Sequence, residues 1–180
     1  RDREETGKIL NKNKNVFWII DPIDGTTNFL HGIPHFAISI ALQDNGEIVI
    51  GLIFDPIKNE IFYAEKNNGA YHNNQRLRVS KKTVLDECLF GTSKDGSCKT
   101  ILNCRISGSA ALDLAYVGAG KLDGYFQNNL NIWDIASGVL IVEESGGILS
   151  PVDLSKINKI DIRASSTNIY EKMLKNINKF

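Results

Sequence analysis

A short apolar run that ends in two acidic residues most constrains how this chain can fold. Residues 16–20 (VFWII) have the character of a buried strand, and the chain continues as DPIDG with Asp21 and Asp24. A rigid strand end can hold side chains at a cleft, and carboxylate oxygens suit Mg²⁺. Gly25 and Thr26 can open a short helix whose first N–H groups bind an anion. The pattern indicates a metal site beside a phosphate site, although aspartate, proline and glycine are also ordinary turn residues.

A third carboxylate opens a predicted helix in the second half of the chain. Residues 131–138 (NIWDIASG) begin this helix, which continues to Glu144 and stops at the glycine pair 146–147. Asp134 lies where the helix starts and points outward from its N-terminus. Taken alone, this aspartate favours the role of a helix cap.

The two motifs resemble the signature motifs of the inositol monophosphatase family. The first is DPIDGTTNF at residues 21–29, and the second is WDIASG at residues 133–138, followed by EESGG at residues 143–147. Between them, SGSAALDLA at residues 107–115 is similar to the family's Gly-(Ser/Thr)-Ala-Ala-Leu helix. The resemblance runs in order from about Glu4 to the C-terminus and is strongest to bacterial members. It implies the layered sugar-phosphatase fold.

The resemblance also implies a role for each residue that matches a motif. Mg²⁺, as two or three ions, would be held by carboxylates and one backbone carbonyl, with Asp21 bridging two ions. A glutamate and a threonine would orient the attacking water, and backbone N–H groups would hold the phosphate. The implied metal ligands are Glu4, Asp21, Ile23, Asp24 and Asp134; the catalytic pair is Glu4 and Thr26; the phosphate ligands are Gly25 and Thr26; and the substrate contacts are Asp24, Ala110, Gln127 and Asp134.

Elementary electrostatics supports a metal at such a cluster. Two carboxylates about 4 Å apart repel each other by roughly 4 kcal/mol at an effective dielectric constant of about 20. Bound cations make the cluster tolerable while it stays ionised. Divalent ions also lower the pKa of a bound water and neutralise a leaving alkoxide, so we expect direct attack by water without a covalent phospho-enzyme.

The amino-acid composition limits the kinds of binding partner that we expect for this protein. Lysine and arginine together number 21, as do aspartate and glutamate, so the net charge gives no sign of a nucleic-acid or membrane partner. No apolar run approaches the length of a membrane span. We therefore expect a cytoplasmic protein that acts on a small-molecule phosphate ester. The family resemblance implies, in addition, a homodimer and inhibition by Li⁺.

Cysteine and histidine show no metal-ligand spacing. The three cysteines are an odd count at irregular intervals, which favours reduced thiols over a disulfide framework or a zinc site. The three histidines are expected at the surface or in satisfied packing positions. These residues are Cys88, Cys98, Cys104, His31, His35 and His72.

Periodicity predicts an α+β first half and an α/β second half. In the first half, strands joined by turns such as DNG at residues 44–46 indicate an antiparallel meander. In the second half, short strands alternate with helices. The boundary is expected near Leu85, which gives a metal-binding half at 1–85 and an α/β half at 86–180, with the site in the cleft between them. The predicted strands are 36–42, 47–54, 60–65, 76–80, 88–91 and 124–126, and the predicted helices are 109–117 and 133–144.

Three features of the sequence depart from the family pattern. The printed sequence begins just before Glu4, whereas the family carries a preceding helical segment that packs on the sheet, so we expect an exposed apolar face there. Residues 93–104 are fewer than the family's counterpart. Gln127 stands where the family usually has a glutamate that binds inositol hydroxyls, and the lost charge is expected to relax the preference for inositol. Gln127 is also compatible with a plain surface residue.

The sequence therefore predicts a Mg²⁺-dependent phosphomonoesterase acting on inositol monophosphate or a similar polyol phosphate. One alternative is a phosphatase of the same superfamily that acts on another small sugar or nucleotide phosphate. The other is a binding or regulatory protein whose phosphatase site is vestigial. The presence of every implied ligand argues against this second alternative, because unneeded buried charges cost stability.

Overall fold

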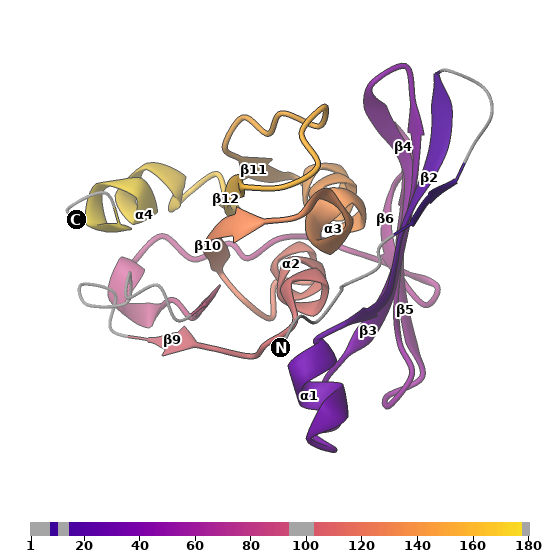
Figure 1. Ribbon diagram of the computed structural model, residues 1–180. Helices are drawn as coiled ribbons and strands as arrows, with labels where there is room; N and C mark the ends of the chain where they lie inside the picture. The colour runs from indigo at the N-terminus through magenta and orange to yellow at the C-terminus, as the bar shows by residue number, and fades with distance from the viewer. Residues whose placement is uncertain (1–7, 11–14, 94–102, 178–180) are drawn as a thin grey trace.

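The chain folds into two β-sheets with helices between them (Figure 1). The structure, a computed structural model, describes residues 8–10, 15–93 and 103–177. The first sheet is an antiparallel meander of seven strands in chain order. Its strands are β1 (Lys8–Leu10), β2 (Val16–Asp24), β3 (Ala37–Asp44), β4 (Glu47–Asp55), β5 (Glu60–Glu65), β6 (Gly69–His72) and β7 (Gln75–Arg76).

The second sheet is mixed and has the strand order β11-β12-β10-β8-β9. Strand β8 runs parallel to β9 and β10, and β12 runs antiparallel to β10 and β11. The predicted combination of an antiparallel half and an α/β half is confirmed, whereas the domain boundary near residue 85 stays a prediction. The strands are β8 (Phe90–Thr92), β9 (Cys104–Arg105), β10 (Gly124–Leu130), β11 (Gly147–Leu149) and β12 (Ile160–Ser166).

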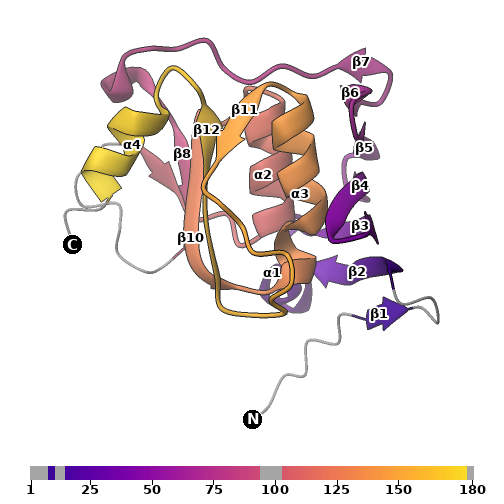
Figure 2. The same cartoon turned by 90° about the horizontal axis from the view of Figure 1, so that it is seen from above.

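Two helices fill the space between the sheets. Figure 2 shows α2 (Ala110–Gly118) and α3 (Ile132–Glu144) side by side in this layer, with α4 (Tyr170–Ile177) on the outer side of the second sheet. A short helix, α1 (Thr26–Leu30), follows β2, and a 3-10 helix covers Leu85–Glu87. None of the described helices has the length and apolar character that a membrane crossing requires.

Two apolar clusters account for this layering. The larger cluster lies around α2 and α3 and includes Ile53 and Phe62 from the first sheet and Ile162 from the second. The smaller cluster joins the second sheet to α4 through side chains such as Phe126 and Met173. Because α2 and α3 contribute to one core with both sheets, the elements that carry the acidic motifs are packed against each other.

The predicted elements of the first sheet largely match the structure. The β3–β4 hairpin turns at Asn45 and Gly46, whose φ values of 50° and 88° are those of a type I′ turn. The strand at Glu60–Glu65 coincides with the prediction. The predicted strand 76–80 is wrong, because β7 ends at Arg76. The last hydrogen bond to β6 is from the Leu77 N–H to Ala70 O at 2.8 Å, and the Val79 N–H donates instead to Ser145 O after α3 at 3.2 Å.

In the second half of the chain, the elements of the structure differ from the predicted ones for local reasons. The strand predicted at 88–91 begins only at Phe90, because the 3-10 turn before it ends with the Cys88 N–H bonded to Leu85 O at 3.0 Å. Strand β10 extends four residues past the predicted 124–126 and contains a bulge. Strands β11 and β12, which build one side of the second sheet, and α4, which covers it, were not predicted from the sequence.

The outer face of the first sheet carries exposed apolar side chains, as expected from the sequence. Trp18, Ile50, Ile61 and Tyr63 lie on neighbouring strands and are exposed, with Trp18 at 40%. They alternate along their strands with the buried residues that face α2 and α3. Exposed apolar side chains on neighbouring positions of a sheet are typical of a surface that contacts another segment or partner.

Close backbone packing sets the position of α3 on the sheet. A Cβ at Gly51 of β4 would lie 2.8 Å from Ser137 O and 3.0 Å from Ser137 Cα, both backbone atoms of α3. The Ser39 and Ser137 hydroxyl oxygens also lie 3.0 Å apart, which joins β3 to the same turn of α3. Glycine at position 51 therefore lets the helix approach the strand.

We expect Gly51→Ala to lower the free energy of unfolding by about 2 kcal/mol, because the added methyl meets backbone that can move only with the whole helix. Urea denaturation without metal measures this change. The matched variant Glu47→Ala lies at an exposed position of the same strand and should change stability by less than about 0.5 kcal/mol. An equal, small effect of both variants would contradict this account of the packing.

Candidate active site

A bulge in β2 brings the first two aspartates to one face. Two residues three positions apart on a regular strand would point to opposite faces of the sheet. Here Asp21 pairs with Ser39 and Asp24 pairs with Ala37, so β2 holds one extra residue between them. Both aspartates are consequently buried on the side that faces the helices. The strand therefore continues through Pro22 and ends only at Asp24, beyond the apolar run 16–20.

Asp134 combines the two roles that the sequence left open. It is the third residue of α3, and its Oδ2 accepts a hydrogen bond of 2.7 Å from the N–H of the N-cap residue Asn131. This is the capping-box arrangement, which satisfies an otherwise unpaired donor at the helix start. The helix start in turn faces the aspartates of β2. The capping contact and the acidic cluster therefore use the same carboxyl group.

The three carboxylates form a group that can hold a metal ion. One oxygen each of Asp21, Asp24 and Asp134 lies within 4.8 Å of the others. All are hard oxygen donors of the kind that bind Mg²⁺ or Ca²⁺. Three like charges at this separation, two of them on buried side chains, are costly unless a cation or protons compensate them. The donor set present in the chain thus fits a divalent cation.

The N-terminus of α2 holds the Asp24 carboxylate. Asp24 Oδ2 accepts hydrogen bonds from the Ser109 hydroxyl and from the Ala111 N–H, the latter at 2.9 Å. Ser109 is also the N-cap of α2, since its Oγ accepts from the Leu112 N–H at 3.3 Å. The positive end of the helix dipole therefore faces a negative charge. These contacts were not predicted from the sequence.

Burial has the largest effect on the pKa of Asp24. It raises the pKa of Asp24 well above its ordinary value, and the nearby charges of Asp21 and Asp134 raise it further. The hydrogen bonds from Ser109 and Ala111 act in the opposite direction. Without a cation, the site therefore favours a protonated Asp24 at pH values where exposed aspartates are ionised.

A tight turn after Asp24 arranges the predicted phosphate ligands. Gly25 has φ of 88°, a conformation that side chains disfavour, and a Cβ there would lie 3.1 Å from His35 O. The Thr26 hydroxyl donates to Ile23 O at 2.9 Å. Because α1 begins at Thr26, the N–H groups of its first turn have no acceptor within the helix.

Asn28 locks this turn against the segment that leads into α2. Its buried Nδ2 donates to His35 O at 2.7 Å and to Ser107 O at 2.9 Å. Gly108 packs against the same side chain, since a Cβ there would lie 2.9 Å from Asn28 Nδ2. Asn28 belongs to the first motif, but the sequence predicted no role for it. In the structure it joins the two walls of the site.

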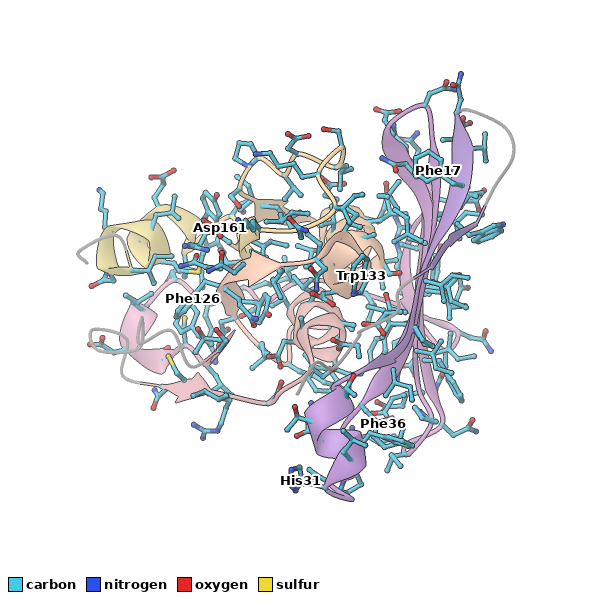
Figure 3. All side chains as sticks on the ribbon, viewed as in Figure 1. Phe17, His31, Phe36, Phe126, Trp133 and Asp161 are labelled. Atoms are coloured by element: carbon cyan, nitrogen blue, oxygen red, sulfur yellow. The ribbon has the colours of Figure 1, made fainter. Side chains whose placement is uncertain are left out.

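These residues line one cavity of about 580 Å³. Its walls come from the β2–α1 turn, the start of α2, strand β10 and the start of α3. In Figure 3, Trp133 lies at the start of α3, between the two sheets. Phe126 lies on the other side of the second sheet, toward α4. The predicted site residues that line the cavity are Asp24, Gly25, Thr26, Ala110, Gln127 and Asp134.

The remaining predicted residues have different positions. Asp21 belongs to the acidic group although it does not line the cavity itself. The Ile23 carbonyl accepts the hydrogen bond from Thr26, and the Ile23 N–H donates to Asp21 Oδ1 at 3.0 Å. Glu4 lies outside the described residues, as do most of residues 93–104 and the thiol of Cys98.

The other cysteines and histidines show no site of their own among the described residues. Cys88 and Cys104 are free thiols. His31 is exposed near the end of α1, where Figure 3 labels it, and His72 stacks on Phe62 with ring centroids 4.5 Å apart. His35 differs from the expectation of satisfied packing, because its buried Nε2 has no hydrogen-bond partner in the described part of the chain.

One buried carboxyl group was missed by the sequence analysis. Asp113 lies in the first turn of α2, is 3% exposed and lines the cavity. Burial raises the pKa of Asp113 to about 7, and a hydrogen bond with the Ser107 hydroxyl opposes this shift. Its carboxyl group packs against Gly91, where a Cβ would lie 3.0 Å from Asp113 Cγ. The signal available in the sequence was an acidic residue inside an otherwise apolar helix.

The chain belongs to the inositol monophosphatase family, whose family profile matches residues 3–179. It is 40% identical to an inositol-1-monophosphatase from Caulobacter vibrioides over 97% of this chain and 76% of that protein. It is 41% identical to a fructose-1,6-bisphosphatase/inositol-1-monophosphatase from Thermotoga maritima over 89% of this chain and 67% of the relative. It is 43% identical to the Nus factor SuhB of Escherichia coli over 82% of this chain and 61% of the relative.

A solved structure shows the same fold. The extragenic suppressor protein suhB from Bartonella henselae superposes with a TM-score of 0.88 at 40% identity, and the match covers 98% of this chain and 75% of that one. The chain thus spans between 61 and 76% of the length of the proteins compared. The layered phosphatase fold predicted from the motifs is confirmed.

We expect Asp113→Asn to stabilise the protein more at pH 8 than at pH 5. The folded-state pKa of about 7 lies above the ordinary value, so the wild type loses stability as pH rises from about 4 to about 7. The asparagine side chain has no proton to lose. The difference in the free energy of unfolding between the variant and the wild type should therefore grow by on the order of 2 kcal/mol between the two pH values.

Urea denaturation at both pH values measures this difference. Asp86→Asn, at an exposed position on the 3-10 helix, is the matched control and should show no such growth. A stability difference between wild type and Asp113→Asn that is the same at pH 5 and pH 8 would contradict the raised pKa.

Proposed function

We propose that this protein is a Mg²⁺-dependent phosphomonoesterase that hydrolyses inositol monophosphate or a similar small polyol phosphate. The observation that carries the proposal is the group of three carboxylates within 4.8 Å, two of which, Asp24 and Asp134, line one cavity with the Gly25-Thr26 turn. Membership of the inositol monophosphatase family supports it. We further propose the cytoplasm as its location and a homodimer as its assembly.

The acidic group and its neighbours would hold the metal. Asp21, Asp24 and Asp134 supply carboxylate oxygens, and the Ile23 carbonyl and Glu4 are proposed as further ligands on the strength of the family motif. Bound Mg²⁺ would lower the pKa of a coordinated water and stabilise negative charge on the phosphate and the leaving oxygen. We propose two or three ions and, from the same family resemblance, inhibition by Li⁺.

The protein groups would position the reactants. The N–H groups of Gly25 and Thr26, at the start of α1, are proposed to bind phosphate oxygens. The Thr26 hydroxyl donates its proton to Ile23 O, so its oxygen lone pairs can accept a hydrogen bond from the attacking water. With Glu4 as the second partner, this would fix the water for in-line attack. Ala110 and Gln127 line the part of the cavity proposed for the alcohol portion of the ester.

We expect Mg²⁺ to raise the melting temperature of the wild type and to leave that of Asp24→Asn unchanged. Saturation at about a hundredfold excess over the dissociation constant contributes about 2.7 kcal/mol to stability. In EDTA, Asp24→Asn should be at least as stable as the wild type, because the amide is neutral without the proton that the buried Asp24 carboxyl group must take up on folding.

Thermal denaturation with Mg²⁺ and with EDTA measures both effects. Asp86→Asn is the control for a neutralised aspartate outside the cavity and should keep the full response to Mg²⁺. If Asp24→Asn responded to Mg²⁺ as strongly as the wild type, the metal site would not be where we place it.

We expect the purified protein to release phosphate from small phosphomonoesters only in the presence of Mg²⁺. Li⁺ should suppress the release, and Asp24→Asn should lower kcat/KM by at least about a hundredfold. A panel of inositol, sugar and nucleotide phosphates, assayed for inorganic phosphate in Mg²⁺, EDTA and Li⁺, tests this.

A second candidate role is that of a regulatory binding protein. It is favoured by the relative named Nus factor SuhB, and the exposed apolar face around Trp18 offers a surface for contact. A folded protein that binds Mg²⁺ and yet turns over no ester in the panel would support this role and contradict the phosphatase.

A further inference from the structure

We propose that a second cavity, separate from the candidate active site, binds a small uncharged molecule that is mostly apolar and carries a hydrogen-bond donor. This cavity has a volume of about 770 Å³ and lies between β2, β3 and the loop that joins β11 to β12. It shares none of its lining residues with the cavity that contains Asp24 and Asp134. A volume of this size is typical of sites for small molecules.

The loop at residues 150–159 forms the wall opposite the first sheet. Figure 1 shows this loop, which joins β11 to β12, beside the end of the sheet at which β2 begins. Hydrogen bonds fix it at two points. The Asp153 carboxylate accepts from the Ser155 N–H at 3.1 Å, which closes a local turn. The Ile157 carbonyl accepts from the Ile132 N–H at the start of α3 at 2.8 Å. The cavity therefore has a preformed wall on this side.

Six apolar side chains line the cavity. Two come from β2, one from the start of α3 and three from the loop, and Figure 3 labels Phe17 at this end of the first sheet. The apolar lining residues are Phe17, Ile19, Ile132, Val152, Leu154 and Ile157. Moving apolar surface from water to such a lining is favourable. The cavity is therefore suited to a ligand with an apolar body.

A buried amide lines the same cavity. Gln43 of β3 pairs with Phe17 of β2, so the two side chains share the inner face of the sheet, and Gln43 is 3% exposed. Gln43 Nε2 donates to the Leu154 carbonyl at 3.5 Å, which is long for a hydrogen bond. Because a carbonyl only accepts, this contact directs the amide nitrogen toward the loop. Within residues 8–10, 15–93 and 103–177, no N–H or O–H group donates to Gln43 Oε1.

The amide oxygen of Gln43 indicates what the ligand must carry. A buried acceptor that lacks a donor costs free energy, and a ligand N–H or O–H group that reaches it removes this cost. An apolar molecule of the same shape without a donor would cover the oxygen and leave it unpaired. The cavity therefore favours apolar ligands that have a donor over those that have none.

The charges of the lining are already compensated, which favours an uncharged ligand. Asp153 and Lys156 are the charged residues among those that line the cavity. Their side chains lie 3.8 Å apart and are 53% and 62% exposed, so they form an ion pair at the rim. An anion or a cation inside the cavity would lose hydration without gaining an opposite charge.

The test compares two probes that differ in one hydrogen-bond donor. Indole carries an N–H group on an apolar ring system, and 1-methylindole has the same rings without that group. Titration of the ¹⁵N-labelled protein in Mg²⁺, followed by NMR, gives both dissociation constants. We expect indole to bind and 1-methylindole to bind about tenfold more weakly, because its methyl group leaves Gln43 Oε1 unpaired. The absence of indole binding, or equal affinity for the two probes, would overturn the proposal.

Three variants locate the binding. Gln43→Met keeps the length of the side chain but has no amide oxygen, so it should abolish the difference between the two probes. Val152→Phe fills the cavity from the loop and should weaken the binding of both probes at least about tenfold. Val84→Phe makes the same change at an exposed position outside the cavity and should leave both dissociation constants unchanged. Equal affinities of wild type and Val152→Phe would place the probes elsewhere and contradict the proposal.

Two further titrations separate this cavity from the candidate active site and test the charge of the ligand. Saturating inorganic phosphate in Mg²⁺ should leave the dissociation constant of indole unchanged, because the two cavities have no lining residue in common. Indole-3-acetate, which is an anion, should bind more weakly than indole. Displacement of indole by phosphate, or tighter binding of indole-3-acetate, would overturn the proposal. Because every readout is binding, the result holds whether or not the protein hydrolyses a phosphate ester.

Discussion

The mutual repulsion of three neighbouring carboxylates is the constraint on which the rest of this structure depends. Each of the three is held by a backbone N–H: that of Ile23 for Asp21, that of Ala111 for Asp24 and that of Asn131 for Asp134. Two of these donors lie at the starts of α2 and α3, where helix dipoles favour negative charge. The two helices must therefore begin at the same end of the layer between the sheets, beside the bulge of β2.

Local motifs predicted which carboxylates come together because each motif carries its own geometry. The spacing of Asp21 and Asp24 around Pro22 indicated paired ligands, and the structure realises the spacing with a bulge. The position of Asp134 at a helix start allowed a cap or a metal ligand, and one carboxyl group now has the geometry of both. The hairpin at Asn45 and Gly46 was predictable for the same reason, since its turn type demands such residues.

Contacts between segments far apart in the sequence could not be predicted in this way. The hydrogen bonds of Ser109 and Ala111 to Asp24 join segments 85 and 87 residues apart, and that of Arg163 to Asn128 spans 35 residues. No local pattern specifies such partners. Strands β11 and β12 were missed because one is short and the other mixes apolar with polar residues, so that tertiary packing stabilises them more than their own propensity does. The apolar residues of α4, by contrast, have helical spacing, so this helix was predictable.

The close approach of α3 to its neighbours bears on which cations the cluster accepts. A Cβ at Gly138 would lie 2.5 Å from Leu114 Cβ on α2, as one at Gly51 would meet the backbone of Ser137 on the opposite side. The helix that carries Asp134 is thus held on two sides with less than a methyl group of clearance. A stiff scaffold of this kind would favour the short, strictly octahedral coordination of the Mg²⁺ proposed above over the longer and more variable coordination of Ca²⁺.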